Sequence, residues 1–129
     1  MSLTVPNLTI QKPIVEMGLI QGQMPGSINE YNFSVALEKL DLPYMYQYQM
    51  GMMGVRGSQR IDFLVLCAPS SQACYIQGTY WHRAATAGED RLKHAIAEHI
   101  FGVGNVHDFT EEETETVEAA IVSIRKKLL

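Results

Sequence analysis

The sequence has few cysteines and no long apolar run. Its two cysteines, Cys67 and Cys74, lack the paired spacing of a zinc site, and a disulfide framework normally needs more of them. We therefore expect buried free thiols in a soluble, cytoplasmic protein. No stretch of about 18 apolar residues occurs, and residues 1–18 lack a basic segment followed by an uninterrupted apolar run. These absences predict that the chain has no membrane partner.

The sequence also lacks an excess of positive charge. Lysine plus arginine is 10 and aspartate plus glutamate is 14, so the net charge is −4 with neutral histidine. Such a chain has no global attraction to nucleic acid, and any polyanion must be held locally. A glycine-rich phosphate loop is not indicated either, because Gly51 to Gly54 lies in a predicted hairpin turn and not between a strand and a helix.

The composition that is present belongs to one globular domain. The 129 residues are 47% hydrophobic and 19% charged, which excludes disorder throughout. At about 150 residues per domain, this length supplies one compact core. Pro6, Pro13 and Pro25 interrupt the first segment and forbid a long helix there. We therefore predict an N-terminal arm at residues 1–26 and one folded domain at residues 27–129.

Regular patterns begin at Ser27 and predict a helix followed by three strands. Ser27 or Asn29 can cap the helix, whose apolar positions follow helical spacing until Pro43 ends it. Strand-like runs separated by turn signals then follow at Tyr44–Met50, Arg60–Leu66 and Ala73–Thr79.

The second half of the domain predicts a helix, a strand and a closing helix. Leu92, Ile96 and Ile100 recur at helical spacing, and Gly102 can end that helix. A short fourth strand is expected over Val103–His107, and a capping box over Thr110–Glu113 is expected to start the last helix. Because the fourth strand must return through a helical crossover, the pattern favours an α/β fold in which helices cover both faces of a mixed sheet.

Two acids interrupt apolar patterns. Asp62 lies within the run Ile61–Leu66, where strand propensity disfavours a carboxylate and a buried charge must be paired or bound to a metal. The alternative is that strand alternation points Asp62 toward water while Ile61 and Phe63 face the core. Glu30 shares the inward stripe of the first helix, although it could equally be a first-turn acid stabilised by the helix dipole.

A histidine and the single tryptophan follow the third predicted strand. Strand ends are where sheets present reactive groups, and histidine transfers protons near neutral pH. Trp81 could stack on a base or pack into the core, and Asp90 could be an ordinary N-terminal acid of the next helix. Together, Glu30, Asp62, His82 and Asp90 supply oxygen ligands and a proton carrier, a combination that suits metal-assisted hydrolysis.

These residues and the order of elements resemble the PD-(D/E)XK nuclease superfamily. The resemblance covers about residues 27–129 and is to the branch of very-short-patch repair endonucleases and phage homing endonucleases with a Glu, Asp, His, Asp signature. The motifs that carry it are Asn29-Glu30, Leu42-Pro43-Tyr44, Tyr46-Gln47, Ile61-Asp62-Phe63-Leu64, Ile76-Gln77-Gly78-Thr79-Tyr80-Trp81-His82 and Glu89-Asp90-Arg91. The resemblance implies a restriction-endonuclease-like core with element order αβββαβα, in which helices flank a mixed central sheet.

The resemblance also implies catalytic roles. Asp62 would be the central ligand of a divalent metal, and Glu30 would support the metal or its water. His82 would act in proton transfer, while Asp90 would orient the histidine or complete the acidic set. Oxygen ligands with retained waters favour Mg²⁺ or Mn²⁺.

DNA contacts are expected from aromatic and basic residues. In the mismatch-repair relatives, aromatic residues before the histidine wedge into the duplex, so Tyr80 and Trp81 are candidates for that role. A local basic rim is expected from arginines near the site in sequence order, namely Arg56, Arg60, Arg83 and Arg91. Because few phosphate contacts give weak binding at physiological salt, a homo-oligomer or a partner protein that supplies targeting is also expected.

The sequence therefore predicts a metal-dependent DNA endonuclease, with two alternatives. Most of the superfamily has an acid, a spacer and a lysine on the third strand, whereas this chain has Gln77-Gly78-Thr79. That departure allows a catalytically inactive nuclease fold that binds DNA or acts in assembly. The second alternative, an α/β protein that binds a small molecule, predicts an enclosed apolar pocket and no basic rim.

Overall fold

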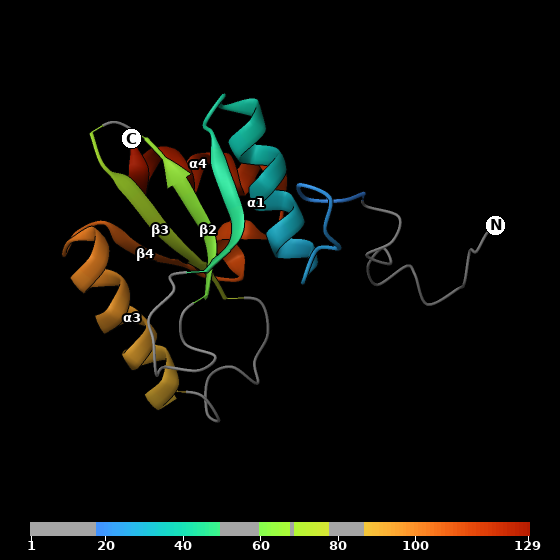
Figure 1. Ribbon diagram of the computed structural model, residues 1–129. Coiled ribbons are helices and arrows are strands. Elements are labelled where there is room, and N and C mark those ends of the chain that lie inside the picture. Colours follow the sequence, from blue (N-terminus) through green and yellow to red (C-terminus); the bar gives the residue numbers. More distant parts are fainter. Residues whose placement is uncertain (1–17, 50–59, 68, 78–86) are drawn as a thin grey trace.

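The computed structural model describes residues 18–49, 60–67, 69–77 and 87–129, with the backbone alone for 87–90 and 93. The elements are, in chain order, α1 (Ile28–Lys39), β1 (Tyr44–Gln49), β2 (Arg60–Leu66), β3 (Ser71–Ile76), α3 (Ala87–Phe101), β4 (Val106–Phe109), the 3-10 turn η3 (Glu112–Thr114) and α4 (Val117–Leu128). The strands form one sheet in the order β1-β2-β3-β4 (Figure 1). The first three strands are antiparallel and β4 is parallel to β3, which confirms an α/β fold with a mixed sheet.

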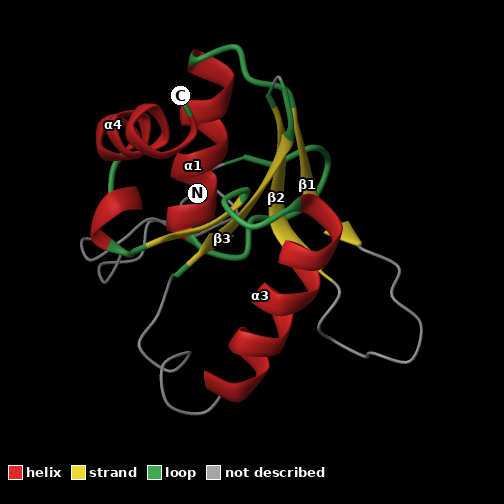
Figure 2. Cartoon of the chain, turned by 90° about the vertical axis from the view of Figure 1, so that its left-hand side faces the viewer, coloured by secondary structure: helices red, strands yellow, loops and turns green. Residues whose placement is uncertain are grey.

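Helices cover both faces of this sheet. Helices α1 and α4 lie together on one face, and α3 lies on the other (Figure 2). The larger core fills the α1 and α4 side, where Phe33 of α1 packs against both Phe63 of β2 and Phe109 of β4. A smaller cluster under α3 contains Ile61, Ala73, Tyr75 and Ala97.

Helix α1 begins as predicted. The Oγ of Ser27 accepts a hydrogen bond from the Glu30 N–H at 3.1 Å, which satisfies one of the free donors of the first turn. Asn29 has a different task, because its Nδ2 donates to the Thr114 hydroxyl at 2.9 Å and to the Glu111 carbonyl at 3.1 Å. The cap at Ser27 is therefore confirmed, and Asn29 joins α1 to the η3 turn.

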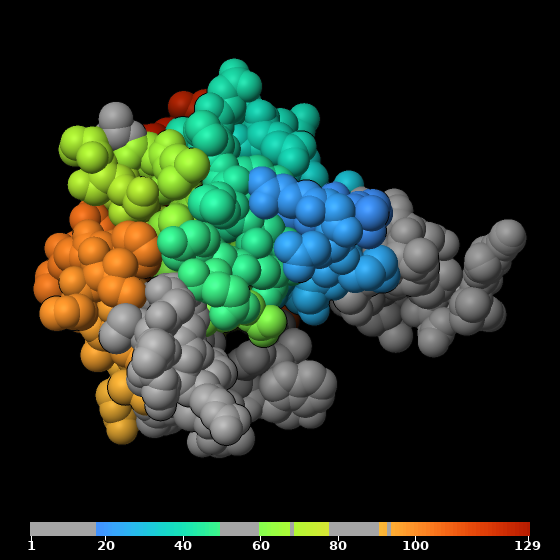
Figure 3. All heavy atoms as spheres, in the orientation of Figure 1, coloured from blue at the N-terminus to red at the C-terminus, as the bar shows by residue number. Residues whose placement is uncertain are grey.

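The outer edge of β1 is covered by the segment that precedes α1. Gln21 donates from Nε2 to the Tyr44 carbonyl at 2.7 Å and accepts at Oε1 from the Tyr46 N–H at 2.8 Å. The side-chain amide thus replaces the peptide group of a neighbouring strand. Ile20, beside it, is buried in the larger core. In Figure 3 the blue atoms of this segment lie directly against the green atoms of β1.

The connection between α3 and β4 differs from the prediction at one end. Gly102 ends α3 as expected, with φ of 103° and an N–H that donates to the Glu98 carbonyl at 2.8 Å. The predicted start of the fourth strand at Val103 is wrong, because Val103 is 84% exposed in a turn and β4 begins at Val106. Gly104, with φ of 96°, continues this turn. The valine at position 103 favours a strand by propensity, which is why the strand was predicted to start there.

The buried face of α3 also departs from the apolar pattern. Ile96 is buried, but Leu92 and Ile100 are 47% and 40% exposed. Ala97 is fully buried in the smaller cluster under α3, and Phe101 packs against that cluster. The inward face of α3 therefore includes Ala97 and Phe101, which the spacing of Leu92, Ile96 and Ile100 did not identify.

The predicted capping box is present but does not start the last helix. Thr110 donates from its N–H to Glu113 Oε1 at 2.9 Å, and its Oγ1 accepts from the Glu113 N–H at 3.2 Å. This reciprocal pair encloses the η3 turn. Helix α4 has its own cap at Thr116, whose Oγ1 accepts from the Ala119 N–H at 3.0 Å. The acidic run therefore belongs to a separate turn.

Two further expectations concern the thiols and membranes. Cys67 and Cys74 are both free, with Cys74 buried and Cys67 half-buried, so the expectation of buried thiols holds fully only for Cys74. Burial raises the pKa of both thiols. Among the described residues, every helix is too short or too polar to cross a bilayer.

Candidate functional site

The site is built around an irregularity in β2. Strict alternation would place Ile61 and Phe63 on the same face of the sheet. Instead, Phe63 belongs to the core under α1, and Ile61 belongs to the cluster under α3. The alternative in which Ile61 and Phe63 face one core is therefore wrong. The alternation breaks at Asp62, and the residue expected opposite it on β1, Gln47, has φ of 59° and does not pair with it.

Asp62 marks the point where β2 and β3 separate. The last backbone pair of these strands is Phe63 with Cys74. Beyond it, Asp62 Oδ2 accepts a hydrogen bond from the Ile76 N–H at 2.8 Å. The carboxylate thus takes the place of a backbone acceptor, and its side chain is held at the end of β3.

Glu30 approaches the same region from α1. The Tyr46 hydroxyl donates to Glu30 Oε1, and the Gly26 N–H donates to the Tyr46 oxygen at 3.0 Å. Tyr46 lies on β1, and its ring packs 4.9 Å from that of Phe63. The aromatic core therefore fixes the group that holds the Glu30 carboxyl.

Glu30 and Asp62 are linked through one strand pair, because Tyr46, which holds Glu30, pairs with Phe63, the residue after Asp62. Burial raises the pKa of Glu30, and the negative charge of Asp62 raises it further. Hydrogen bonds from Tyr46 and the Gly26 backbone, and the positive charge of Arg60, act in the opposite direction. The charges of Asp62 and Arg60 therefore both act on Glu30, and Arg60 is an exposed residue that was predicted to bind DNA.

Most of the other predicted site residues have no described side chain. Asp90 lies in the first turn of α3, where the backbone alone is described. Outside the described residues are His82, Tyr80, Trp81, Arg56 and Arg83. Residues 78–86 join Gln77, directly after β3, to the start of α3. The roles of these residues stay predictions.

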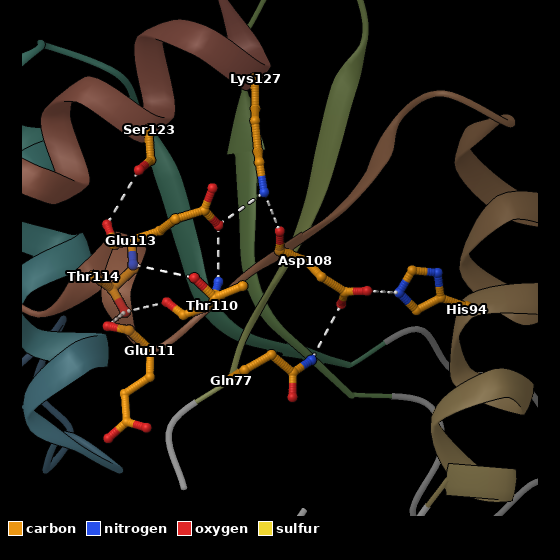
Figure 4. Close-up of polar contacts among 9 residues, drawn as sticks. All are labelled: Gln77, His94, Asp108, Thr110, Glu111, Glu113, Thr114, Ser123 and Lys127. Carbon is orange, nitrogen blue, oxygen red and sulfur yellow. Dashed lines mark hydrogen bonds and ion pairs between the residues drawn. The ribbon is translucent and has the colours of Figure 1, made fainter. Parts of the chain in front are cut away.

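A second polar cluster, which the sequence analysis missed, lies on the α3 side of β4. His94 Nε2 on α3 lies 2.8 Å from Asp108 Oδ2, and Gln77 Nε2 donates to Asp108 Oδ1 at 3.3 Å (Figure 4). The His94 ring stacks on Tyr75 with centroids 5.4 Å apart. Arg91, the remaining predicted DNA-binding residue, is exposed and lines a hollow of about 350 Å³ beside this cluster.

Lys127 connects the same strand to the η3 turn. Its Nζ donates to the Asp108 carbonyl and to Glu113 Oε1 at 2.9 Å, and it lies 4.7 Å from the centroid of the Phe109 ring (Figure 4). Lys127 thus donates to one acceptor in β4 and to one in η3. These contacts hold α4 against β4 and the η3 turn, so Lys127 has a structural role.

The carboxylates of Glu30 and Asp62 are ligands that suit a hard cation. Within the described residues, no group of three or more His, Cys, Asp and Glu side chains is arranged to hold a metal ion. Glu30 and Asp62 nevertheless supply carboxylate oxygens, and Mg²⁺ typically takes one or two carboxylates together with waters and substrate phosphate. A cation would also offset the repulsion that raises the pKa of Glu30. These residues therefore fit Mg²⁺ or Mn²⁺ better than zinc.

Comparison of this chain with protein-family models, with curated proteins and with solved structures gives no match. The function is therefore inferred from the side chains around Glu30 and Asp62 and from those around His94 and Asp108.

Proposed function

We propose that this protein is a metal-dependent endonuclease that hydrolyses phosphodiester bonds in DNA. The observation that supports the proposal is that Glu30 of α1 is bonded to Tyr46 of β1, whose strand partner Phe63 directly follows Asp62 on β2. The element order, with three antiparallel strands and a fourth reached through α3, is compatible with the nuclease core that the sequence resembles. The proposal is thus supported by topology and by the acids together.

Glu30 and Asp62 are the residues that would hold Mg²⁺ or Mn²⁺. Such an ion supplies positive charge that stabilises the developing charge on a phosphate during hydrolysis. Asp62 is fixed by the Ile76 N–H, so its carboxylate does not need to reorder when a ligand arrives. Arg60, whose charge acts on Glu30, is placed to attract a phosphate to the same position.

Proton transfer has two candidate groups in this proposal. Burial and the Asp62 charge raise the pKa of Glu30, so this carboxyl exchanges its proton closer to neutral pH than an exposed glutamate does. His82 is the second group and is proposed from the sequence resemblance. Asp90 would orient that histidine, and Tyr80 with Trp81 would contact the duplex.

Plasmid nicking tests this function. The wild-type protein is incubated with supercoiled plasmid, and with mismatched and branched duplexes, in Mg²⁺ and in Mn²⁺. We expect cleavage that Asp62→Ala lowers by a factor on the order of 100 or more. Asp41→Asn is the matched control, because Asp41 is an exposed acid in the turn after α1. Absence of cleavage by the wild-type protein on every substrate and with both metals contradicts the proposal.

A catalytically inactive DNA-binding or assembly module is the second candidate. It is favoured by Gln77, which stands where an acid is expected and whose side chain donates to Asp108. This candidate predicts DNA binding without cleavage. In that case Arg60→Ala weakens binding about uniformly across sequences, whereas Asp62→Ala, which removes a negative charge, does not weaken it.

A further inference from the structure

Glu30 is held by a small clamp that the sequence patterns did not indicate. Tyr46 donates its hydroxyl hydrogen to Glu30 Oε1, and the same hydroxyl oxygen accepts from the Gly26 N–H at 3.0 Å. Burial, and then the neighbouring Glu30 carboxyl, raise the pKa of Tyr46 well above its usual value. The hydroxyl therefore stays a proton donor over the whole physiological range.

Gly26 completes the clamp by having no side chain. A Cβ at this position would lie 2.8 Å from Glu30 Oε1 and 3.0 Å from Oε2. The 2.8 Å distance is shorter than the contacts that Cβ atoms make in proteins, so the carboxyl group at the end of the Glu30 side chain would have to move. The observed position of the Glu30 carboxyl against the backbone therefore depends on glycine at position 26.

We infer that Tyr46 and Gly26 are positioning residues that fix the orientation of the Glu30 carboxyl, and that they thereby set its contribution to the proposed reaction. The inference rests on the proposed function for its effect on cleavage. Tyr46 acts through Glu30 and has no predicted contact with substrate. Its role resembles that of the outer hydrogen-bond partners that orient metal-ligating groups.

A second tyrosine–glutamate bond between β1 and α1 serves as a control for the Tyr46–Glu30 bond. Tyr44, two residues earlier on β1, donates its hydroxyl to Glu38 Oε2 at 2.8 Å, so the same type of bond joins the same strand and helix. Both tyrosine rings pack against Phe63. The charge of Asp62 raises the pKa of Glu30, and Glu38 lies two helical turns further along α1. Loss of either hydroxyl removes one tyrosine–glutamate bond, but only one of these bonds lies at the acid pair.

The experiment compares Tyr46→Phe with Tyr44→Phe in the full chain. The ¹³C signal of the Glu30 side-chain carboxyl is followed against pH in metal-free protein. Tyr46→Phe is expected to raise the pKa of Glu30 further, because a donor to the carboxylate is lost, and Asp62→Asn is expected to lower it. Tyr44→Phe is expected to leave this titration unchanged. Gly26→Ala, which leaves every core ring in place, is expected to shift it as Tyr46→Phe does.

Plasmid cleavage with Mn²⁺ supplies the second readout. Tyr46→Phe is expected to lower the rate by about 10- to 100-fold and to move the acid limb of the pH–rate profile to higher pH, with Tyr44→Phe close to wild type. An unchanged Glu30 titration in both Tyr46→Phe and Gly26→Ala overturns the inference, as does an equal shift in Tyr44→Phe. If the wild-type protein does not cleave DNA but Tyr46→Phe still shifts the titration, the endonuclease proposal fails and the positioning of Glu30 stands.

Discussion

At the scale of single residues, Glu30 carries an electrostatic cost that can be measured. A carboxyl group whose pKa is raised on folding binds its proton more tightly in the folded state, so its charge costs stability above the raised pKa and that cost is absent below the ordinary value of 4.5. Glu30→Gln keeps an oxygen that can accept from Tyr46 but removes the charge. We expect a gain on the order of 1 kcal/mol in the free energy of unfolding at about pH 8.

The gain should disappear as the pH falls toward about 3, where Glu30 is protonated in both states. Urea unfolding at the two pH values provides the measurement. Glu38→Gln on the same helix is the control, since its partner is the Tyr44 hydroxyl. A Glu30→Gln variant no more stable than wild type at about pH 8 would contradict a net cost of this charge.

Residues differ in how far their roles can be predicted from sequence. Asp62 and Glu30 stand out because each places a charge in an apolar pattern, and in the structure the Tyr46–Phe63 pair of β1 and β2 links them. Tyr46 could not be found in this way, because an alternating tyrosine in a strand is the pattern of an ordinary core residue. The pairing of His94 with Asp108 joins distant parts of the chain through tertiary packing, which no local pattern encodes.

At the scale of secondary-structure elements, the edge of β1 depends on one side chain. Gln21→Ala removes both hydrogen bonds to this edge, and we expect a loss of about 1–2 kcal/mol in the free energy of unfolding. The Tyr46 amide should then exchange its hydrogen faster, which amide hydrogen exchange measures. Gln23→Ala, at an exposed position in the same turn, should change neither quantity. Equal effects of the two substitutions would show that the Gln21 amide does not protect the edge.

The η3 turn is joined to α1 through one buried hydroxyl. Thr114 accepts from Asn29 and donates to the Thr110 carbonyl at 3.0 Å. Thr114→Val keeps the shape of the side chain but leaves the Asn29 amide without this acceptor, so we expect a cost of about 2 kcal/mol in urea unfolding. Thr114→Ser keeps the hydroxyl and should cost less. A Thr114→Val variant as stable as Thr114→Ser would contradict a role for the bond.

Helix ends were predicted correctly where the residue type strongly favours that position, as a capping serine or a glycine with positive φ does. Ser27 and Gly102 are such residues, and both lie at helix ends as expected. Val103 was misleading because its strand propensity is overridden by the glycine turn around it. The capping box at Thr110 was read correctly as a local bond pair, but its pattern cannot tell a single turn from the start of a long helix.

At the scale of the whole molecule, the sheet has one large core and one small core. Phe33→Ala is expected to cost about 3–5 kcal/mol and to speed hydrogen exchange throughout the sheet, since its ring contacts Phe63 and Phe109. Phe101, the last residue of α3, is half-buried, with its ring 6.5 Å from that of Tyr48. Phe101→Ala should cost less and should speed exchange mainly in α3. Faster exchange in all strands after Phe101→Ala would contradict two separable cores.

The global arrangement was predictable because few topologies suit the element order. Three consecutive strands form hairpins, and a strand that returns after a helix lies parallel to its neighbour. What could not be predicted is the break at Asp62, because alternation is a local rule and the break depends on the divergence of β3 and on Gln47. The candidate site thus lies where the simplest rule fails, as is common at functional positions.

The position of β4 has a consequence for how the chain matures in the cell. Phe33 and Phe63 are synthesised well before Phe109 and Ile124, which complete the same hydrophobic cluster. Until the ribosome has released residues 106–124, one side of the growing sheet keeps bare aromatic surface. A pause in translation just before β4 should therefore prolong chaperone occupancy of the nascent polypeptide, whereas the same pause after α4 should have little effect.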